Sequence, residues 1–255
     1  MSVSYRIVIP ARLASQRLPN KPLAIIGTHP LIEYVHRRAR ASSAEAVVIA
    51  TDSDAVRAAA ESFGAQVVMT SSCHTTGSDR IAECADILGW EDETLVVNLQ
   101  GDEPLMPASC LDQVAGLLRQ DGMADVASLY WPIGDHAEAL DPNVVKVVID
   151  RNGHALYFSR SEIPHTRDPS EVAAHRHGHY PWKRHIGLYA YRAGALRAFA
   201  AMAPSPLEAM EKLEQLRFLE SGHRIAMAEA RDFIPAGVDT PDDLERVRRL
   251  IEAGG

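Results

Sequence analysis

The sequence predicts an α/β protein with a mainly parallel sheet, and three observations support this fold class. Short runs rich in β-branched residues in the N-terminal part are apolar almost throughout, as in strands buried on both faces. Patterns with helical spacing lie between those runs, and strand alternating with helix is typical of crossover units. From about residue 125 strand-like runs follow one another with few long helices between them. We therefore expect a parallel core with an added β-rich region.

The N-terminal part contains four expected strands separated by helices. The strands are Tyr5–Ile9, Ala46–Thr51, Gln66–Met69 and Thr94–Leu99. The expected helices are Leu31–Ala41, a second one that Ser53 caps and Gly64 ends, and Arg80–Leu88. Because ligands of open α/β sheets gather at the carboxyl ends of the strands, we expect the loop after the first strand to face such a crevice.

The C-terminal part contains the β-rich region and further helices. Strand-like runs cover 125–133, 143–150, 154–159 and 185–192, and DRNG at 150–153 has the composition of a hairpin turn. A helical pattern covers SPLEAMEKLEQLRFLESG, residues 205–222, and ends at Gly222. In the last helix we expect Thr240 as the cap, Pro241 at the first position and Asp243 in an acidic capping box. Residues 1–255 are expected to form one domain.

Composition and charge argue against several classes of protein. With 255 residues, 46% of them hydrophobic, the chain can bury one sizeable core. A formal net charge of −8 argues against a general nucleic-acid or membrane-surface binder, because these need a net positive field. The three cysteines form no CxxC pair and are odd in number, so we expect reduced thiols. No apolar run has membrane length and the start lacks a signal-peptide pattern, so we expect a cytoplasmic protein.

The stretch IPARLASQRLPNKPL, residues 9–23, is the first candidate binding segment. It brings Arg12, Arg17 and Lys21 within ten positions at the end of the first strand, on a backbone that two prolines stiffen. Arginine supplies forked donors and lysine a compact charge, a combination suited to the oxygens of a triphosphate. The ordinary interpretation is a solvated connector with incidental charges. The chain has no GxxxxGK[ST] pattern, so a P-loop is excluded.

The stretch NLQGDEP, residues 98–104, places Asp102 and Glu103 directly after an apolar strand, so they are expected to emerge into the same crevice. Mg²⁺ prefers one or two carboxylates together with phosphate oxygens. Asp239, in GVDTP, is the candidate second carboxylate. Its competing interpretation is strong, because an aspartate before Thr-Pro often braces the start of a helix.

Two histidine-bearing segments are further candidates. The loop HTTGSDR, from His74 to Arg80, can read a base or a sugar; alternatively it is a helix start capped by Ser78. In HRHGHYPWKRH the residues His175, His177 and His179 alternate, which would put three imidazoles on one face of an extended chain and allow Zn²⁺ or Ni²⁺ binding. A solvated loop is favoured there, because no thiol or carboxylate pattern completes a zinc site.

Taken together, these motifs resemble the 3-deoxy-manno-octulosonate cytidylyltransferase family, the CMP-Kdo synthetases, over nearly the whole chain and in order. The stretches that carry the resemblance are IPARLASQRLPNKPL, QGDEP, DPNVVKVV, ALYFSR, RHIGLYAYR, PSPLEAMEKLEQLR and GVDTPDDLERVR. The resemblance implies a Rossmann-like nucleotidyltransferase fold in which 125–200 is a β-rich dimerisation and sugar-binding subregion. It also implies Mg²⁺ as cofactor, CTP and Kdo as substrates, and a homodimer without nucleic-acid or membrane partners.

The resemblance assigns expected roles to individual residues. For catalysis these are Arg12, Lys21, Asp102 and Asp239, of which Asp102 and Asp239 would hold Mg²⁺. Nucleotide contacts are expected from Ala11, Arg12, Leu13, Lys21, His74, Ser78, Arg80 and Gln100. Sugar contacts are expected from Gln100, Arg160, His185, Tyr189, Glu214 and Gln215. Arg160 suits the carboxylate of the sugar acid, and hydrogen-bonding groups suit its hydroxyls.

Departures and alternatives accompany this resemblance. The family loop commonly reads HxSGTER where this chain has HTTGSDR, which puts the geometry around cytidine in question but not the nucleotide class. An enzyme for an 8-amino Kdo analogue remains an alternative substrate assignment, whereas a sialate synthetase is disfavoured because the loop after IPAR is not rich in glycine and lysine. A non-catalytic nucleotide sensor is the alternative from another class. No residue is marked as a general base, and neither the number of metal ions nor the order of the 161–183 loop is specified.

Overall fold

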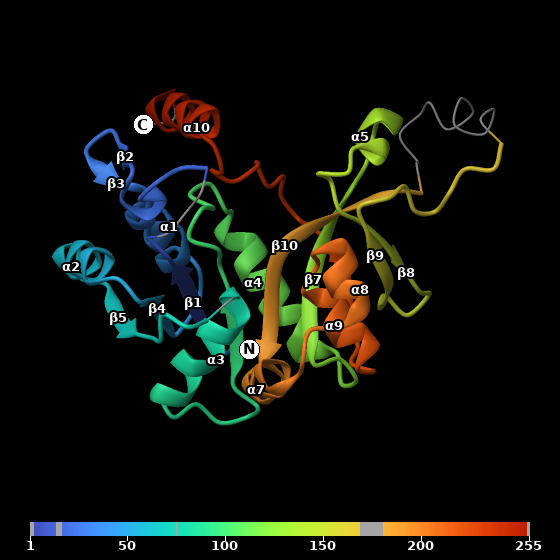
Figure 1. Ribbon diagram of the computed structural model, residues 1–255, viewed down its shortest axis with the longest axis horizontal. Coiled ribbons are helices and arrows are strands. Elements are labelled where there is room, and N and C mark those ends of the chain that lie inside the picture. The colour runs from blue at the N-terminus through green and yellow to red at the C-terminus, as the bar shows by residue number, and fades with distance from the viewer. Residues whose placement is uncertain (1–2, 14–16, 75, 169–180, 254–255) are drawn as a thin grey trace.

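A nine-stranded sheet forms the centre of the structure, a computed structural model that describes residues 3–13, 17–74, 76–168 and 181–253 (Figure 1). Its strands are β1 (Arg6–Ala11), β4 (Ala46–Thr51), β5 (Gln66–Met69), β6 (Leu95–Asn98), β7 (Val126–Pro132), β8 (Lys146–Ile149), β9 (Ala155–Ser159), β10 (Lys183–Arg192) and β11 (Ile225–Glu229). The main path of the sheet has the order β11-β7-β10-β6-β1-β4-β5; β8 pairs with β10, and β9 pairs with β8. A separate small ribbon pairs β2 (Ile25–Ile26) with β3 (His29–Pro30).

The sheet is mainly parallel, as the sequence predicts. Strand β1 runs parallel to β4 and β6, β4 runs parallel to β5, and β11 runs parallel to β7. Strand β10 is antiparallel to both β6 and β7, so the β-rich region continues the parallel core instead of forming a separate sheet. The hairpin of β8 and β9, which turns at 150–153, pairs antiparallel and joins β10 through Arg184 and Lys146. The predicted hairpin turn is therefore confirmed.

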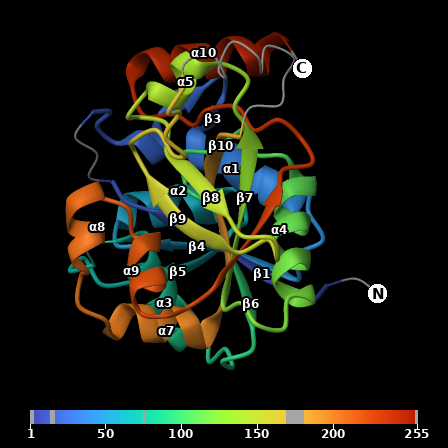
Figure 2. The ribbon, with the colours of Figure 1, turned by 90° about the vertical axis from the view of Figure 1, so that its right-hand side faces the viewer.

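Helices cover both faces of this sheet (Figure 2). The helices are α1 (Leu31–Arg40), α2 (Asp54–Ser62), α3 (Gly77–Ile87), α4 (Ala108–Gln120), α5 (His136–Leu140), α7 (Ala193–Ala201), α8 (Pro206–Glu211), α9 (Gln215–Glu220) and α10 (Pro241–Ala253), with a 3₁₀ turn at Lys21–Leu23. Successive side chains of β1 point to opposite faces of the sheet. Ile7 and Ile9 belong to the core beneath α1, α2 and α4, and Val8 belongs to the core beneath α3, α7 and α9. None of the helices in these described stretches is both long and apolar enough to span a bilayer.

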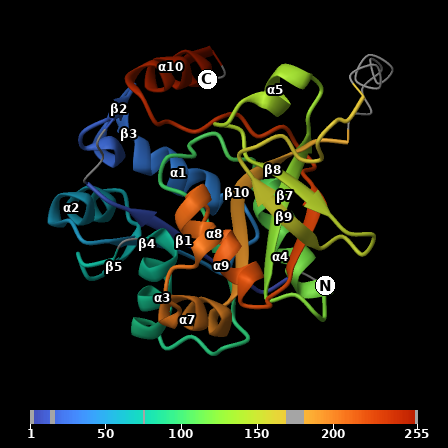
Figure 3. The same ribbon diagram turned by 45° about the vertical axis from the view of Figure 1, so that its right-hand side comes forward.

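The helix expected over 205–222 is wrong as a single element. It breaks at Lys212, whose φ of 56° lies in the left-handed region, so α8 and α9 are separate short helices beside β10 (Figure 3). In a continuous helix Glu208 and Arg217, which are nine positions apart, would lie about 13 Å apart along the helix axis. The break instead folds α9 back on α8, where Arg217 pairs with Glu208 through Nη2 and Oε1 at 2.5 Å.

Helix caps agree with the sequence at two places and differ at a third. The Ser53 side chain accepts a bond from the Val56 amide at the start of α2, and Thr240 and Asp243 bond each other at the start of α10. Helix α3 begins earlier than expected, at Gly77, because Thr76 forms the capping box with Asp79. Ser78 is therefore not the cap, and its hydroxyl is free for the contact described below.

Candidate active site

Two adjacent hollows open at the carboxyl ends of the central strands, where open α/β sheets bind ligands. The first has a volume of about 500 Å³ and is lined by the end of β1 and by the loop after β6. The second has a volume of about 600 Å³ and lies toward β10 and the turn between α8 and α9. Four residues line both hollows: Gly77, Gln100, Glu214 and Asp239. A ligand in the first hollow can therefore meet a ligand in the second along this shared boundary.

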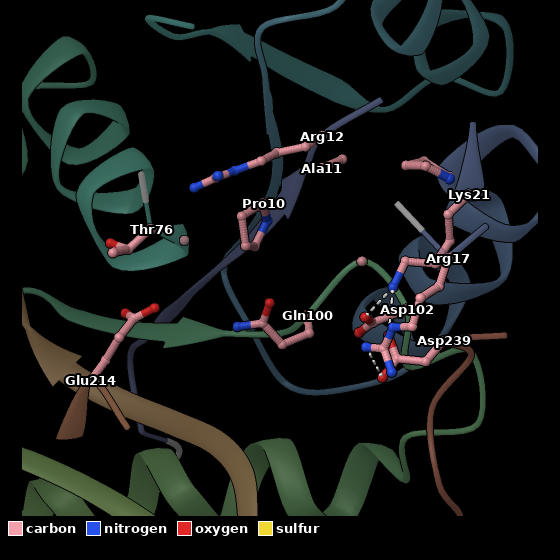
Figure 4. Close-up of a pocket in the computed structure, with 13 residues that line it drawn as sticks. Pro10, Ala11, Arg12, Arg17, Lys21, Thr76, Gln100, Asp102, Glu214 and Asp239 are labelled. Carbon is pink, nitrogen blue, oxygen red and sulfur yellow. Dashed lines mark hydrogen bonds and ion pairs between the residues drawn. The ribbon is translucent and has the colours of Figure 1, made fainter. Parts of the chain in front are cut away.

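The loop after β1 directs its three cations into the first hollow, as the sequence predicts. Asn20 takes a left-handed conformation before the 3₁₀ turn, which aims Lys21 back at the strand ends. The Lys21 ammonium lies 2.7 Å from an Asp102 oxygen and 3.1 Å from an Asp239 oxygen, and Arg17 lies 3.0 Å from Asp239 (Figure 4). Burial alone would lower the pKa of Lys21, but the two carboxylates outweigh it and the pKa of Lys21 is raised.

A third carboxyl group, that of Glu103, lies beside these two aspartates, but it is mostly protonated at neutral pH and adds little negative charge. Burial, and then the charges of Asp102 and Asp239, raise the pKa of Glu103 to about 8. The Val238 amide donates to the Asp102 carbonyl at 2.8 Å, so the GVDTP turn is tied to the QGDEP loop. A Cβ at Gly237 would lie 3.0 Å from the Asp102 carbonyl oxygen and 2.9 Å from a Glu103 oxygen, so glycine at this position permits the close approach of the two segments.

This pair of aspartates fits a hard cation. An ammonium already bridges Asp102 and Asp239, which shows that a positive group is accommodated between them. Among the described residues no three His, Cys, Asp or Glu side chains are grouped to hold a metal. Two carboxylates are nevertheless what Mg²⁺ commonly takes from a protein when phosphates complete its shell.

The second hollow is lined by aromatic and hydrogen-bonding groups. The Ser78 hydroxyl donates to Glu214 at 2.9 Å, and the Gln100 amide donates to Asn98 at 3.1 Å. Burial raises the pKa of Glu214. Tyr189, Tyr191, Gln215 and Arg160 complete the polar lining. In Figure 4 Gln100 lies between Glu214 on one side and the Lys21–Asp102 pair on the other. Such a lining suits a polyhydroxylated, anionic ligand.

Comparison with known proteins identifies the family. Residues 6–225 match the cytidylyltransferase family. The 3-deoxy-manno-octulosonate cytidylyltransferase of Thioalkalivibrio sulfidiphilus is 52% identical over 98% of this chain and 100% of the relative. The chain belongs to the 3-deoxy-manno-octulosonate cytidylyltransferase family. The Pseudomonas fluorescens (strain SBW25) protein of the same name is 51% identical over 99% of this chain and 100% of its own length.

Solved structures agree with this family and with the fold. A CMP:2-keto-3-deoxy-manno-octonic acid synthetase complexed with CTP superposes with a TM-score of 0.90 at 38% identity, over 99% of both chains. A 4-diphosphocytidyl-2C-methyl-D-erythritol synthase, 16% identical, has a TM-score of 0.62 over 97% of this chain and 99% of its own, and shares the fold alone. The predicted Rossmann-like nucleotidyltransferase fold is confirmed.

The structure places the site residues expected for a 3-deoxy-manno-octulosonate cytidylyltransferase in four groups. Ala11, Arg12, Lys21 and Asp102 line the first hollow alone, and Gln100, Glu214 and Asp239 line both. The second hollow also takes Ser78, Arg160, Tyr189 and Gln215. Outside the lining of both hollows lie Leu13, His74, Arg80 and His185. Their expected roles stay predictions.

Three of the residues outside the hollows have partners elsewhere. His74 lies 2.5 Å from Glu83, and Arg80, a fully buried residue of helix α3, lies 2.8 Å from Asp52. His185 is within 3.0 Å of the Ser128 hydroxyl, and burial lowers its pKa to about 3, so its imidazole is neutral. His175, His177 and His179 lie outside the described residues.

Sequence reasoning missed several residues that line these hollows. Tyr191 and Lys212 were not candidates, and Thr76, Gly77 and Asn98 were included only as members of candidate stretches, without roles of their own. Asn98 had a usable signal, because it is a polar residue that ends an apolar strand. Lys212 had none, because its place depends on the break between α8 and α9.

Gly101 fixes the approach of the QGDEP loop to β1, and we expect Gly101→Ala to destabilise the protein by about 1–3 kcal/mol through overpacking. A Cβ there would lie 2.9 Å from the Pro10 carbonyl oxygen, so the loop carrying Asp102 must move away. Denaturant unfolding measures the change. The matched control is Gly116→Ala in α4, where a Cβ meets nothing within 4 Å and a gain of about 0.5–1 kcal/mol is expected. Equal unfolding of Gly101→Ala and the wild type would contradict this close contact.

Proposed function

We propose that this chain transfers CMP from CTP to the anomeric hydroxyl of Kdo and releases pyrophosphate. The observation that carries the proposal is the joining of two hollows at Gln100, Glu214 and Asp239. One hollow gathers Arg12, Lys21 and an aspartate pair suited to a triphosphate, and the other has the polar lining expected for a sugar acid. Membership of the family and the likeness to a synthetase complexed with CTP support the same assignment.

In this proposal the first hollow binds the nucleotide. Arg12 and Lys21 contact the phosphates and stabilise charge on the departing pyrophosphate. Lys21 must exchange part of its present contact with Asp102 and Asp239 for phosphate oxygens. Asp102 and Asp239 are the residues that would hold Mg²⁺, and the bound ion would supply charge withdrawal from the α-phosphoryl group.

The second hollow orients the sugar acid. Arg160 pairs with its carboxylate, while Gln100, Tyr189, Glu214 and Gln215 position the hydroxyls. The anomeric oxygen attacks the α-phosphorus in line: the new O–P bond forms as the bond to the β-phosphate oxygen breaks. The hydroxyl proton leaves to solvent, and pyrophosphate departs. Orientation across the boundary of the two hollows is the main contribution of the chain to this step.

The setting of the reaction is part of the proposal. CMP-Kdo formed by this chain supplies lipopolysaccharide biosynthesis from the cytoplasm, where CTP is available. A homodimer formed through the 125–200 subregion is part of the same proposal and follows from the family resemblance; Leu140 and Leu156, which are 56% and 61% exposed in this single chain, are candidates for its contacts.

The test is pyrophosphate release from CTP with Mg²⁺, comparing Kdo, its 8-amino analogue, sialic acid and no sugar. We expect release with Kdo and none without sugar. Preference for the 8-amino analogue would retain the mechanism and change the substrate. A folded protein that binds CTP but releases no pyrophosphate with any of these sugars would overturn the proposal and favour a nucleotide sensor.

A further inference from the structure

We propose that Glu211, the last residue of α8, is a positioning residue that fixes Arg160 against the turn carrying Glu214 and Gln215, and so sets the affinity for the sugar acid. The inference rests on the proposed function and deepens it, because it concerns how the sugar hollow is held in shape. Glu211 itself lines neither hollow. Its influence therefore passes through Arg160.

Glu211 holds the end of β9 with three acceptors. One carboxylate oxygen accepts from the Ser159 hydroxyl at 2.6 Å, and the other accepts from the Arg160 amide at 3.0 Å. The Glu211 carbonyl accepts from the Arg160 Nε at 2.8 Å. One residue thus binds both the main chain and the side chain of Arg160, which leaves little freedom for either.

Lys146 holds Arg160 from the opposite side. Its side chain is fully buried, and its ammonium donates to the carbonyls of Arg160 and Val144 at 2.6 Å and of Asp141 at 2.9 Å. Burial lowers the pKa of Lys146, while the nearby charges of Asp141 and Glu211 act against that shift. The backbone of Arg160 is therefore held at its N–H by the Glu211 carboxylate and at its carbonyl by the Lys146 ammonium.

The guanidinium of Arg160 is oriented but keeps its charge unpaired within the described part of the chain. Its Nε and Nη1 donate to carbonyls, those of Glu211 and Pro142, and no described carboxylate forms an ion pair with it. Carbonyls orient a cation without neutralising it. The Nη2 group of the guanidinium can therefore bind an anionic ligand in the second hollow.

The same contacts tie Arg160 to the rest of the sugar hollow. Glu211 comes directly before Lys212, whose left-handed conformation starts the turn, and Leu213 anchors that turn in the core at 6% exposure. Glu214 and Gln215 follow at once and line the hollow. Glu211 thus fixes the spacing between the group that takes the carboxylate and the groups that take the hydroxyls.

The test is steady-state kinetics of Glu211→Ala, with Glu211→Gln as the conservative variant. We expect the KM for Kdo to rise roughly tenfold, about 1.4 kcal/mol, with kcat and the dissociation constant of CTP little changed. Glu211→Gln keeps an acceptor and is expected to recover part of the loss. Glu93→Ala is the matched control, because it removes an exposed glutamate paired with Arg192 at 2.8 Å, at the opposite ends of the strands.

A double-mutant cycle separates positioning from a general loss of structure. If Glu211 acts through Arg160, adding Glu211→Ala to Arg160→Ala changes the KM for Kdo no further. An unchanged KM in Glu211→Ala, an additive effect in the cycle, or an equal loss of CTP affinity would overturn the inference. The wild-type protein distinguishes the two proposals. If the wild type does not use Kdo, the proposed function is overturned and the inference with it. If the wild type turns over Kdo and Glu211→Ala has the same kinetics, the inference alone is overturned.

Discussion

Asp102→Asn is expected to lower kcat by about 10²- to 10³-fold, the scale on which a group that stabilises transition-state charge acts. The substitution keeps the shape of the side chain and removes its charge from the pair with Asp239. The proposed cation site then loses half of its negative charge, while the Lys21 ammonium still has Asp239 at 3.1 Å. The loss should therefore appear in turnover and only weakly in binding of CTP.

Stability of the ligand-free Asp102→Asn protein should change little. The Asp102 side chain is 28% exposed, and partly exposed ion pairs contribute about 1 kcal/mol or less. Thermal unfolding and pyrophosphate release, measured on the same sample, check both parts. Asp54→Asn is the control, since it neutralises an 82% exposed aspartate that pairs with Arg57 on α2. Wild-type turnover in Asp102→Asn would refute the role of this carboxylate, and a large fall in melting temperature would show that its role is structural.

The parallel core could be predicted because its signals are local. The expected strands 46–51 and 66–69 coincide with β4 and β5, and the first helix ends one residue earlier than expected. Strand β4 and helix α1 are buried over most of a face, so their apolar pattern is dictated by the core they join, whereas only Val68 of the edge strand β5 is buried. Ser53 and Thr240 were found as caps because a cap is chosen by its immediate neighbours.

The break between α8 and α9 could not be predicted from local pattern. Residues 205–222 have good helical spacing, and the turn at Lys212 requires a left-handed conformation that lysine rarely adopts. What stabilises the break is tertiary: Arg217 returns to Glu208, and Leu213 and Leu216 are both buried in the core. A sequence shows helical propensity, whereas this turn depends on contacts made after folding.

The candidate site was predicted in its parts but not in its assembly. Lys21 and Asp239 were both candidates, yet their contact spans 218 positions and depends on the parallel order of β1 and β6. Arg80 differs from the expected setting: the motif suggested a cation in a polar loop, whereas its side chain is fully buried and bonded to Asp52, and its expected nucleotide contact stays a prediction. Residue type and spacing indicate what a side chain can bind, but not where it points. At the start of α3 the cap is Thr76 and not the expected Ser78, so the helix begins earlier and its first side chains take different directions.

Arg217→Met is expected to destabilise the protein by about 3–5 kcal/mol, because it leaves the Glu208 carboxylate buried without its cation. Arg217 and Glu208 are 5% and 8% exposed, and their two contacts measure 2.5 and 2.7 Å. The guanidinium also lies over the Phe199 ring at 4.0 Å. Denaturant unfolding at neutral pH measures the loss, and Arg57→Met, which removes a 45% exposed arginine, is the control with an expected change near zero.

The dependence of this loss on pH distinguishes the buried charge from lost packing. Burial alone would raise the pKa of Glu208, but the bonds from Arg217 outweigh it and hold the pKa below 4.5. In the wild type the pair therefore stabilises the fold above that pH and loses its contribution as the pH falls through the folded-state pKa. Without Arg217, burial raises the pKa of Glu208 instead, so protonation relieves the variant as the pH falls. The gap between the two proteins should be widest near neutral pH and shrink as the pH falls through and below the usual titration range of a glutamate.

Adding Glu208→Gln to Arg217→Met should recover part of the stability at neutral pH, since the amide keeps the capping contact with Ser205 without a charge. A gap that stays constant with pH, and no recovery in the double variant, would mean that packing and not charge is what Arg217 supplies.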